Sequence, residues 1–210
     1  MGDPVVVPVT FISQQPGLCG AACAQMLLHA RGAVGTSLDE QFALWDDIKA
    51  HTQRTQPNPH VPRRTVCGSF DNQICERDGD HAQCWCTHPR ALATTLNTRL
   101  DGASSFAPTA GDEQAVTAIA LERIDRGIPS AMLVYGTRHW VIVHGYTPVE
   151  EGGMVLGNHR VSQIHIRNPQ YIDANGAQHA FDIDEWMANF MAVVEFGEYS
   201  GRCVIVTEEE

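Results

Sequence analysis

The sequence predicts an α+β fold in which a helical amino-terminal half packs on a carboxy-terminal antiparallel sheet. Up to about residue 127, apolar residues recur at the three- and four-residue spacing of amphipathic helices, and from residue 130 onward they form short runs separated by turn residues. Helices first and strands second is the order typical of folds that segregate the two kinds of element. With 210 residues, 43% of them hydrophobic, the chain can bury one good core, so we expect a single domain over residues 1–210.

The helical half begins with an extended lead-in at residues 5–12, followed by four predicted helices. The first starts at Cys19, directly after a proline-glycine turn, and the others span about 38–50, 89–100 and 112–127. The last three have start signals, which are a Ser-x-x-Glu capping box, an initial proline and an Asp cap. The apolar residues at helical spacing are Ala22, Met26, Leu27 and Ala30 in the first helix, Leu38, Phe42, Trp45 and Ile48 in the second, Leu92, Leu96 and Leu100 in the third, and Val116, Ile119, Ala120 and Ile124 in the fourth.

The second half of the chain predicts two antiparallel hairpins, a short helix and two further strands. Asn168 and Pro169 end the strand at 161–167, because proline cannot donate to a continuing strand ladder. The predicted strands span 130–135 and 139–146, 154–156 and 161–167, and finally 192–196 and 203–207, with a turn at 173–176 and a helix at 183–190.

A stretch at about residues 51–89 lacks this periodicity, and we interpret it as an insertion rich in Cys, His and Pro. Long irregular segments are uncommon in compact domains unless they are functional, disordered or held by crosslinks or metal. Three states are open for its cysteines: a structural zinc site, in which His81 or His88 could replace a thiolate, two disulfides, or unlinked thiols. They are Cys67, Cys75, Cys84 and Cys86, and their spacing lacks the paired C-x2-C pattern that indicates zinc most clearly.

Charge and hydropathy disfavour two classes of partner. The chain has 14 basic and 25 acidic residues, a net charge of −11, and nucleic-acid phosphates repel such a surface. No apolar run approaches the roughly 20 residues of a membrane span, and the first residues lack the basic and apolar regions of a secretory signal. We therefore expect a chain made in the cytoplasm, acting there or as a secreted effector. Its oligomeric state is not indicated by the sequence.

Cys19 has the position of a cysteine nucleophile. The thiolate is the attacking species, and thiols at helix amino termini have lowered pKa values because free N–H groups and the helix dipole stabilise the anion. Cys23 lies one turn later on the same side of the helix, where we expect it to be part of the core. The chain has 7 cysteines, an odd number, so at least one thiol stays outside any intrachain disulfide.

A cysteine nucleophile also needs a base, a group that orients the base, and a donor for the oxyanion. His139 opens an apolar strand, where its ring can project into a cleft, and His144 on the same strand is the rival base. Asn168 follows the end of a later strand and could accept a hydrogen bond from the ring of the base. Gln14 precedes Cys19 by five residues and could supply a side-chain N–H beside the helix terminus.

The order of these motifs resembles that of papain-like cysteine peptidases, in particular the bacterial C39-like branch. In that branch a Gln precedes Cys-Gly and a helix, a His-Trp strand ends in Gly-Tyr, and an Asp-Pro closes a later strand. The resemblance covers roughly residues 5–30 and 129–206 and leaves the middle unmatched. The residues that carry it are Gln14, Cys19-Gly20, His139-Trp140, Gly145-Tyr146, Asn168-Pro169, and Glu185-Trp186 before a terminal strand at Ala192–Phe196.

The resemblance implies a papain-like fold and a thiol hydrolase acting on a peptide or isopeptide bond, with no cofactor required for catalysis. It implies Cys19 as nucleophile, His139 as base, Asn168 as orienting residue and Gln14 in the oxyanion hole. Gln14 precedes Cys19 by five residues, where six is more usual in these enzymes. This departure leaves Gln15 as the alternative oxyanion residue, and we favour Gln14. Two other functions remain open, an acyl transferase of transglutaminase type on the same scaffold and a non-catalytic binding module with a metal-pinned loop.

Overall fold

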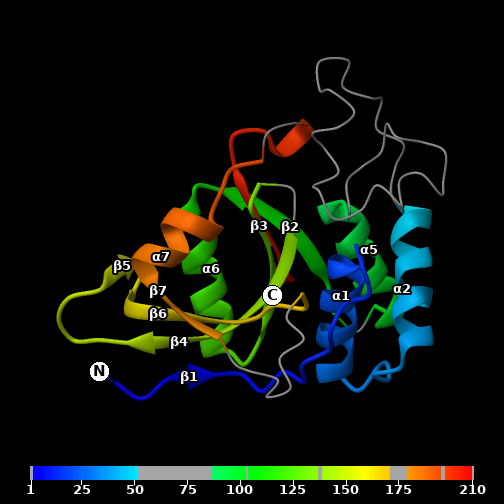
Figure 1. The fold of residues 1–210 in the computed structure, drawn as a ribbon, viewed down its shortest axis with the longest axis horizontal. Coiled ribbons are helices and arrows are strands. Elements are labelled where there is room, and N and C mark those ends of the chain that lie inside the picture. Colours follow the sequence, from blue (N-terminus) through cyan, green and yellow to red (C-terminus); the bar gives the residue numbers. More distant parts are fainter. Residues whose placement is uncertain are drawn as a thin grey trace.

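The computed structural model describes residues 2–51, 87–102, 104–136, 139–170, 179–194 and 197–209 (Figure 1). Its centre is an antiparallel sheet in the order β2-β8-β3-β4-β6-β5, with β1 added beside β4 and β7 beside β6. The strands are β1 (Val5–Val6), β2 (Phe106–Gly111), β3 (Ser130–Val134), β4 (His139–Pro148), β5 (Met154–Leu156), β6 (His159–Arg167), β7 (His179–Asp182) and β8 (Cys203–Glu208). The described chain thus has the predicted mixture of helices and antiparallel strands.

Helices cover both faces of this sheet. The α-helices are α1 (Cys19–Ala30), α2 (Leu38–His51), α5 (Pro89–Arg99), α6 (Glu113–Asp125) and α7 (Ile183–Glu185), which continues into a π-helical turn, η2 (Trp186–Phe190). A short 3-10 turn, η3 (Gly197–Tyr199), precedes β8. Figure 1 shows α1, α2 and α5 grouped together on one side, with α6 and α7 on the other.

Strand alternation produces two apolar cores. Leu133 and Val204 face the core that α1, α2 and α5 close, whereas Met132 and Ile205 face the core that α6 and the α7–η2 segment close. The prediction that all four long helices form one half is therefore wrong for α6. A helix's own periodicity shows that it has a buried side but not which face of the sheet it covers.

Most element boundaries agree with the sequence signals. Helix α1 begins at Cys19, Ser37 Oγ accepts a hydrogen bond from Glu40 N at 3.3 Å, and Asp112 Oδ1 accepts from Ala115 N at 2.7 Å. The hairpin of β3 and β4 also forms, in a register that pairs Val134 with His139. Helix ends and hairpins were predictable because each depends on a few neighbouring residues.

The buried side of α2 differs from the predicted stripe. Leu38 and Phe42 are 47% and 46% exposed, whereas Gln41 is only 2% exposed and lies beneath them with Ile48. Gln41 turns inward because its amide has three polar partners there, which are described with the site.

Two strands were not predicted, and the described part of one predicted strand, residues 192–194, is not a strand. β2 lies at the edge of the sheet, the place where a strand tolerates its Pro108, and β7 pairs with β6 over only four residues. Residues 192–194 are irregular, although Val194 exchanges two backbone hydrogen bonds with the segment before β8, to Arg202 O and from Gly201 N, each at 2.8 Å. The terminal strand is therefore β8 alone in the described part of the chain.

The predicted cysteine-rich insertion lies almost entirely outside the described residues. Cys67, Cys75, Cys84, Cys86 and His81 all fall in residues 52–86, so zinc, disulfides and unlinked thiols all remain predictions. His88 is described, and its Nδ1 accepts a hydrogen bond from Arg90 N at 3.2 Å as the cap of α5. Within the described ranges, no group of His, Cys, Asp or Glu side chains is arranged to hold a metal ion.

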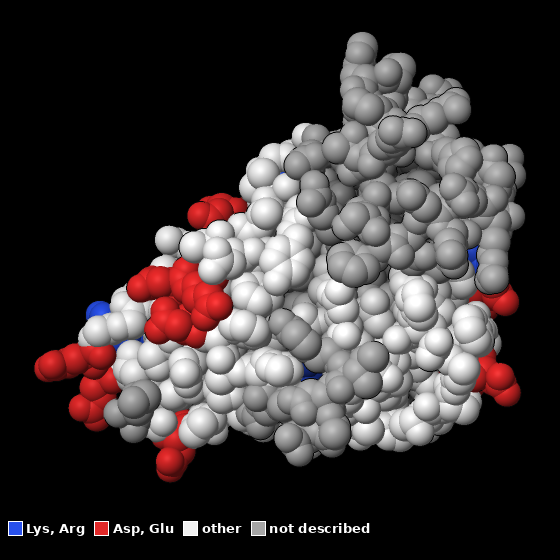
Figure 2. All heavy atoms as spheres, in the orientation of Figure 1, with Lys and Arg blue, Asp and Glu red and all other residues white. Residues whose placement is uncertain are grey.

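The surface view agrees with the acidic composition. In Figure 2, Asp and Glu side chains gather over α7, whose first turn contains Asp184 and Glu185, and basic side chains are sparse on this face. A polyanion would meet repulsion there. Among the described helices, none combines the length and apolar character that a membrane crossing requires.

Candidate active site

Cys19 is the first residue of α1 and is 3% exposed. The residue before it, Leu18, caps the helix without a side-chain hydrogen bond, so the cap residue itself does not occupy the N–H groups of the first turn. An anion that forms at this end of the helix is stabilised by these groups and by the dipole. Cys23 is fully buried one turn later, and burial, together with the nearby Cys19, raises its thiol pKa well above 9.0. Cys23 is therefore part of the core, as predicted.

Thr87 joins the start of α1 to the start of β4. Its side chain lies against Gly20, where an added Cβ would come within 2.0 Å of Thr87 Oγ1, and its carbonyl accepts a hydrogen bond from Trp140 Nε1 at 3.1 Å. Gly20 follows Cys19 and Trp140 follows His139, so one residue contacts the neighbours of both candidates. Helix α1 also packs directly against β4. Thr87 therefore links the start of α1, next to Cys19, with Trp140, the neighbour of His139 on β4.

His139 and Asn168 form the closest polar contact of the site. Their side chains are 6% and 3% exposed, and His139 Nε2 lies 2.7 Å from Asn168 Oδ1. The same Oδ1 accepts a hydrogen bond from the backbone N–H of Gln170 at 3.0 Å. An N–H can only donate, so this end of the amide must be the oxygen, and His139 Nε2 must carry the proton. The unprotonated nitrogen of the neutral ring is therefore Nδ1.

Burial keeps this imidazole in its neutral form. Desolvation lowers the pKa of His139 below its ordinary value of 6.5, and the hydrogen bond to Asn168 offsets part of that effect. A neutral ring with its proton fixed on Nε2 can accept a proton at Nδ1, which is the requirement for a general base.

His144, the rival base, has a different environment. It is fully buried, and its Nδ1 lies 3.0 Å from the carbonyl oxygen of Val7, so Nδ1 must donate there. Burial, with a smaller contribution from nearby Arg167 and His165, lowers its pKa from 6.5 to about 4, although the hydrogen bond to Val7 opposes this shift. The residue also falls at a bulge of β4, between Val143 and Gly145. His144 is held against the amino-terminal segment, so the geometry favours His139.

Gln14 lies beside the residue that follows Asn168, because Gln14 N donates a hydrogen bond to Pro169 O at 2.8 Å. Its side-chain Oε1 is buried and makes no hydrogen bond within the described part of the chain. The chain then turns into α1 through a hydrogen bond from Leu18 N to Gln15 O at 2.9 Å. Of the two glutamines, Gln14 is thus tied to the Asn168 end of β6, and Gln15 begins the turn that leads to Cys19.

Sequence reasoning missed two residues of this neighbourhood. Thr87 follows the insertion, where no local pattern indicates that it contacts α1 and β4. Gln41 lies on α2 among residues that were expected to form an apolar stripe. Its spacing was the one available signal, because positions 41, 44 and 48 lie on the same side of a helix and the other two are the apolar Leu44 and Ile48.

Comparisons with known proteins give a weak structural likeness and no match in sequence. No family model matches the sequence, and no curated protein matches it. Among solved structures, the chain resembles a double glycine motif protease from an AMS/PCAT transporter, solved in complex with the leader peptide. The TM-score is 0.48 and the sequence identity 13%, over 97% of this chain and 94% of that chain. A likeness of this size carries no argument about activity, so the functional conclusion rests on the site itself.

Proposed function

We propose that this chain is a cysteine peptidase of papain-like fold that hydrolyses a peptide or isopeptide bond. The observation that carries the proposal is the hydrogen-bonding of His139, which leaves Nδ1 as the proton acceptor on β4, the strand against which α1 packs. Cys19 at that helix terminus is then the nucleophile, His139 the general base and Asn168 the residue that orients the ring.

The first half of the reaction forms a thioester. Cys19 Sγ attacks the substrate carbonyl carbon while its proton passes to Nδ1 of His139. The oxyanion accepts hydrogen bonds from the Cys19 backbone N–H and from the side-chain amide of Gln14. When the tetrahedral intermediate collapses, the imidazolium returns its proton to the leaving amine, and the acyl group stays on Sγ.

The second half regenerates the thiol. A water molecule gives a proton to Nδ1 as its oxygen attacks the thioester carbonyl, and the resulting intermediate expels Cys19, which recovers the proton. Throughout, the proton on Nε2 stays in its hydrogen bond to Asn168. Asparagine holds the ring in this tautomer but, being uncharged, stabilises the imidazolium less than an aspartate does.

The test uses p-nitrophenyl acetate, an ester small enough to require no specificity pocket. The wild type should release p-nitrophenol in a burst and gain one acetyl group on Cys19, located by mass spectrometry of peptides. Cys19→Ala should abolish the burst, and Cys23→Ala should retain it. Acetylation of any other residue, or a burst that survives Cys19→Ala, contradicts the proposal, and an unreactive Cys19 would favour the binding-module alternative.

Hydrolysis and acyl transfer are then distinguished by which molecule accepts the acyl group from Cys19, water or an added amine. The wild type and Cys19→Ala are incubated with a proteome-derived peptide library, with and without added methylamine. New carboxyl termini that depend on Cys19 support hydrolysis. Methylamide products in place of carboxylates would instead assign the chain to the acyl transferases.

A further inference from the structure

One buried side chain holds the backbone on both sides of Gln14. Gln41, on α2 and 2% exposed, accepts a hydrogen bond from Gln15 N at 2.8 Å through Oε1 and donates one to Ser13 O at 3.1 Å through Nε2. A single planar amide therefore fixes the two peptide groups that flank Gln14. Residues 13 and 15 lie 28 and 26 positions from Gln41, so this contact is tertiary and is not part of a local turn.

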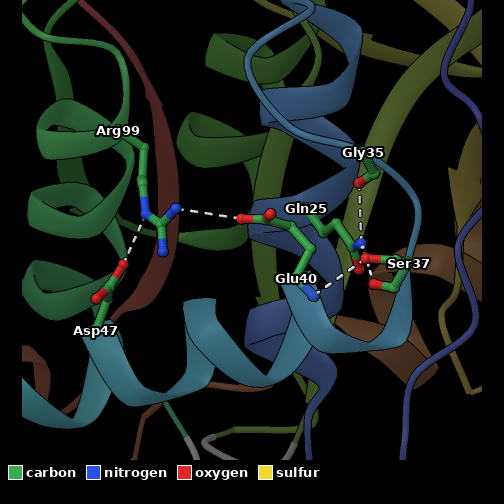
Figure 3. A network of polar contacts seen from close by, with 6 residues as sticks. All are labelled: Gln25, Gly35, Ser37, Glu40, Asp47 and Arg99. Atoms are coloured by element: carbon green, nitrogen blue, oxygen red, sulfur yellow. Dashed lines mark hydrogen bonds and ion pairs between the residues drawn. The ribbon is translucent and has the colours of Figure 1, made fainter.

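A second glutamine fixes Gln41 in turn. Gln25, fully buried on α1, accepts a hydrogen bond from Gln41 Nε2 at 3.2 Å. Its own Nε2 donates to Gly35 O at 3.0 Å and Ser37 O at 2.8 Å, and Figure 3 shows Gln25 reaching from α1 to the connection that leads into α2. Each glutamine amide also bonds to peptide groups, whose roles are fixed, and this determines the donor and acceptor in the bond between the two amides.

The position of Gln14 depends on this network because the side-chain oxygen of Gln14 is not itself held by a hydrogen bond in the described part of the chain. Its Oε1 is buried without a hydrogen bond in the described part of the chain, and its backbone N–H is bonded to Pro169 O. The backbone of residues 13–15, from which this side chain projects, is held by Gln41 on one side and by Pro169 O on the other.

We propose that Gln41 is a positioning residue for the oxyanion hole, acting through Gln14. This inference rests on the proposed function, since it assigns Gln14 to the oxyanion. Donors that stabilise an oxyanion act only when they are aimed beforehand at the position where charge develops, and small displacements are costly. Gln41 would then affect the formation of tetrahedral intermediates without touching the substrate.

The chemistry of two small reagents separates this role from a purely structural one. Acylation of Cys19 by p-nitrophenyl acetate passes through a tetrahedral oxyanion, whereas alkylation by iodoacetamide is a direct displacement at a saturated carbon and forms none. Both reactions need a reactive thiolate. The ratio of the two rates therefore reports the oxyanion hole alone.

The central variant is Gln41→Leu, which keeps the size of the side chain and removes every hydrogen bond. We expect its acylation rate to fall about 10- to 100-fold, the scale of a displaced catalytic group, with the alkylation rate within about twofold of wild type. Gln41→Asn keeps the amide one methylene shorter and should show a smaller loss. It also serves as the test if Gln41→Leu does not fold.

The matched control removes other contacts of α2, those between its carboxylates and Arg99. Arg99 on α5 bonds to Asp47 Oδ2 at 2.7 Å and Glu40 Oε1 at 3.2 Å, both on α2, and Figure 3 shows Arg99 reaching these two carboxylates from α5. Arg99→Gln should lower the melting temperature and leave the rate ratio unchanged. If Arg99→Gln changes the ratio as much as Gln41→Leu does, the assigned role of Gln41 is wrong.

A double-mutant cycle completes the experiment. In a Gln14→Ala background, Gln41→Leu should cause no further loss of acylation, because the group through which it acts is gone. Additive losses, or a wild-type ratio in Gln41→Leu, would overturn the inference while leaving the peptidase proposal intact. Failure of the peptidase proposal is recognised separately, by acetylation that does not depend on Cys19.

Discussion

The side chain of Thr87 fills the space beside Gly20 that any larger residue would require. A Cβ at position 20 would lie 2.0 Å from Thr87 Oγ1 and 2.4 Å from Thr87 Cβ, far inside van der Waals contact. Since the carbonyl of Thr87 also accepts the hydrogen bond from Trp140, the residue sets how closely the ends of α1 and β4 approach. Gly20 is thus required for close packing at the site.

Gly20→Ala should therefore damage both stability and activity. Overpacking of this kind costs about 1–3 kcal/mol, or roughly 2–4 °C of melting temperature for each kcal/mol in a chain of this size. The acylation rate should fall as well, because relief of the clash moves Cys19 away from His139. Melting curves and p-nitrophenyl acetate kinetics measure the two effects.

A second substitution tests the cause. Gly20→Ala combined with Thr87→Gly removes the three nearest atoms of the clash, Oγ1, Cβ and Cγ2 of Thr87, and should recover part of the lost activity. Gly35→Ala is the matched control, since no heavy atom lies within 4 Å of a Cβ built there. Equal losses in Gly20→Ala and Gly35→Ala would show that Thr87 does not set this spacing.

Asn168→Ala should lower the acylation rate about 10- to 100-fold, less than the roughly 10²–10⁴-fold that a whole general acid–base contributes, because His139 itself remains. The variant removes the acceptor of the Nε2 proton of His139 and leaves the ring free to turn. The peptide N–H of Gln170 also loses its partner, so the melting temperature is measured in parallel. An unchanged rate in a folded variant would remove Asn168 from the proposed mechanism.

Asn168→Asp keeps the hydrogen-bond acceptor beside His139 and adds a negative charge. A carboxylate accepts the same two hydrogen bonds, and its negative charge favours the imidazolium, so the pKa of His139 should rise. In the wild type, burial holds that pKa below 6.5, and the acid limb of the acylation profile should lie below that pH. In the variant the limb should move to higher pH. A limb at the same pH in both proteins would mean that another group titrates.

The parts of the fold that could be predicted depend on neighbouring residues. Ser37, Asp112 and Gly127 mark helix ends through single hydrogen bonds or a left-handed backbone, which Gly127 adopts with φ +77°. The contact of His139 with Asn168 was also predictable, because each lies at an end of an apolar strand. Ends of antiparallel strands meet when the strands pair, as β4 and β6 do.

The parts that could not be predicted depend on tertiary contacts. Gln41 turns inward and leaves Phe42 exposed because buried hydrogen bonds to distant peptide groups outweigh local periodicity. The side of the sheet on which α6 packs is likewise set by the strands that surround it. Thr87 contacts both α1 and β4, and no sequence pattern around residue 87 indicates these contacts.

The buried histidines predict a loss of stability in acid. The pKa of His144 is about 4 in the folded chain, against an ordinary value of 6.5. Below about pH 6.5 the unfolded chain binds a proton that the folded chain excludes, so stability falls as pH decreases from 6.5 toward 4. The melting temperature should therefore drop between neutral pH and about pH 5, in the range where histidines titrate.

His144→Asn isolates this contribution. The shorter amide can still donate toward Val7 O but does not titrate, so the fall in melting temperature between pH 7 and about pH 5 should be smaller than in the wild type. His51→Gln, at the end of α2, is the control for loss of a histidine. If His144→Asn and the wild type lose the same number of degrees, His144 does not contribute to the acid sensitivity.

The two adjacent glutamines should differ sharply in their effect on acylation. Gln14→Ala removes the proposed oxyanion donor and should lower the rate of acylation by p-nitrophenyl acetate about 10²- to 10³-fold, with iodoacetamide alkylation unchanged. Gln15→Ala should retain near-wild-type acylation, because the role of Gln15 at Gln41 uses its backbone N–H and not its side chain. The reverse result would transfer the oxyanion assignment to Gln15. It would also remove the reason for Gln41 to act through residue 14.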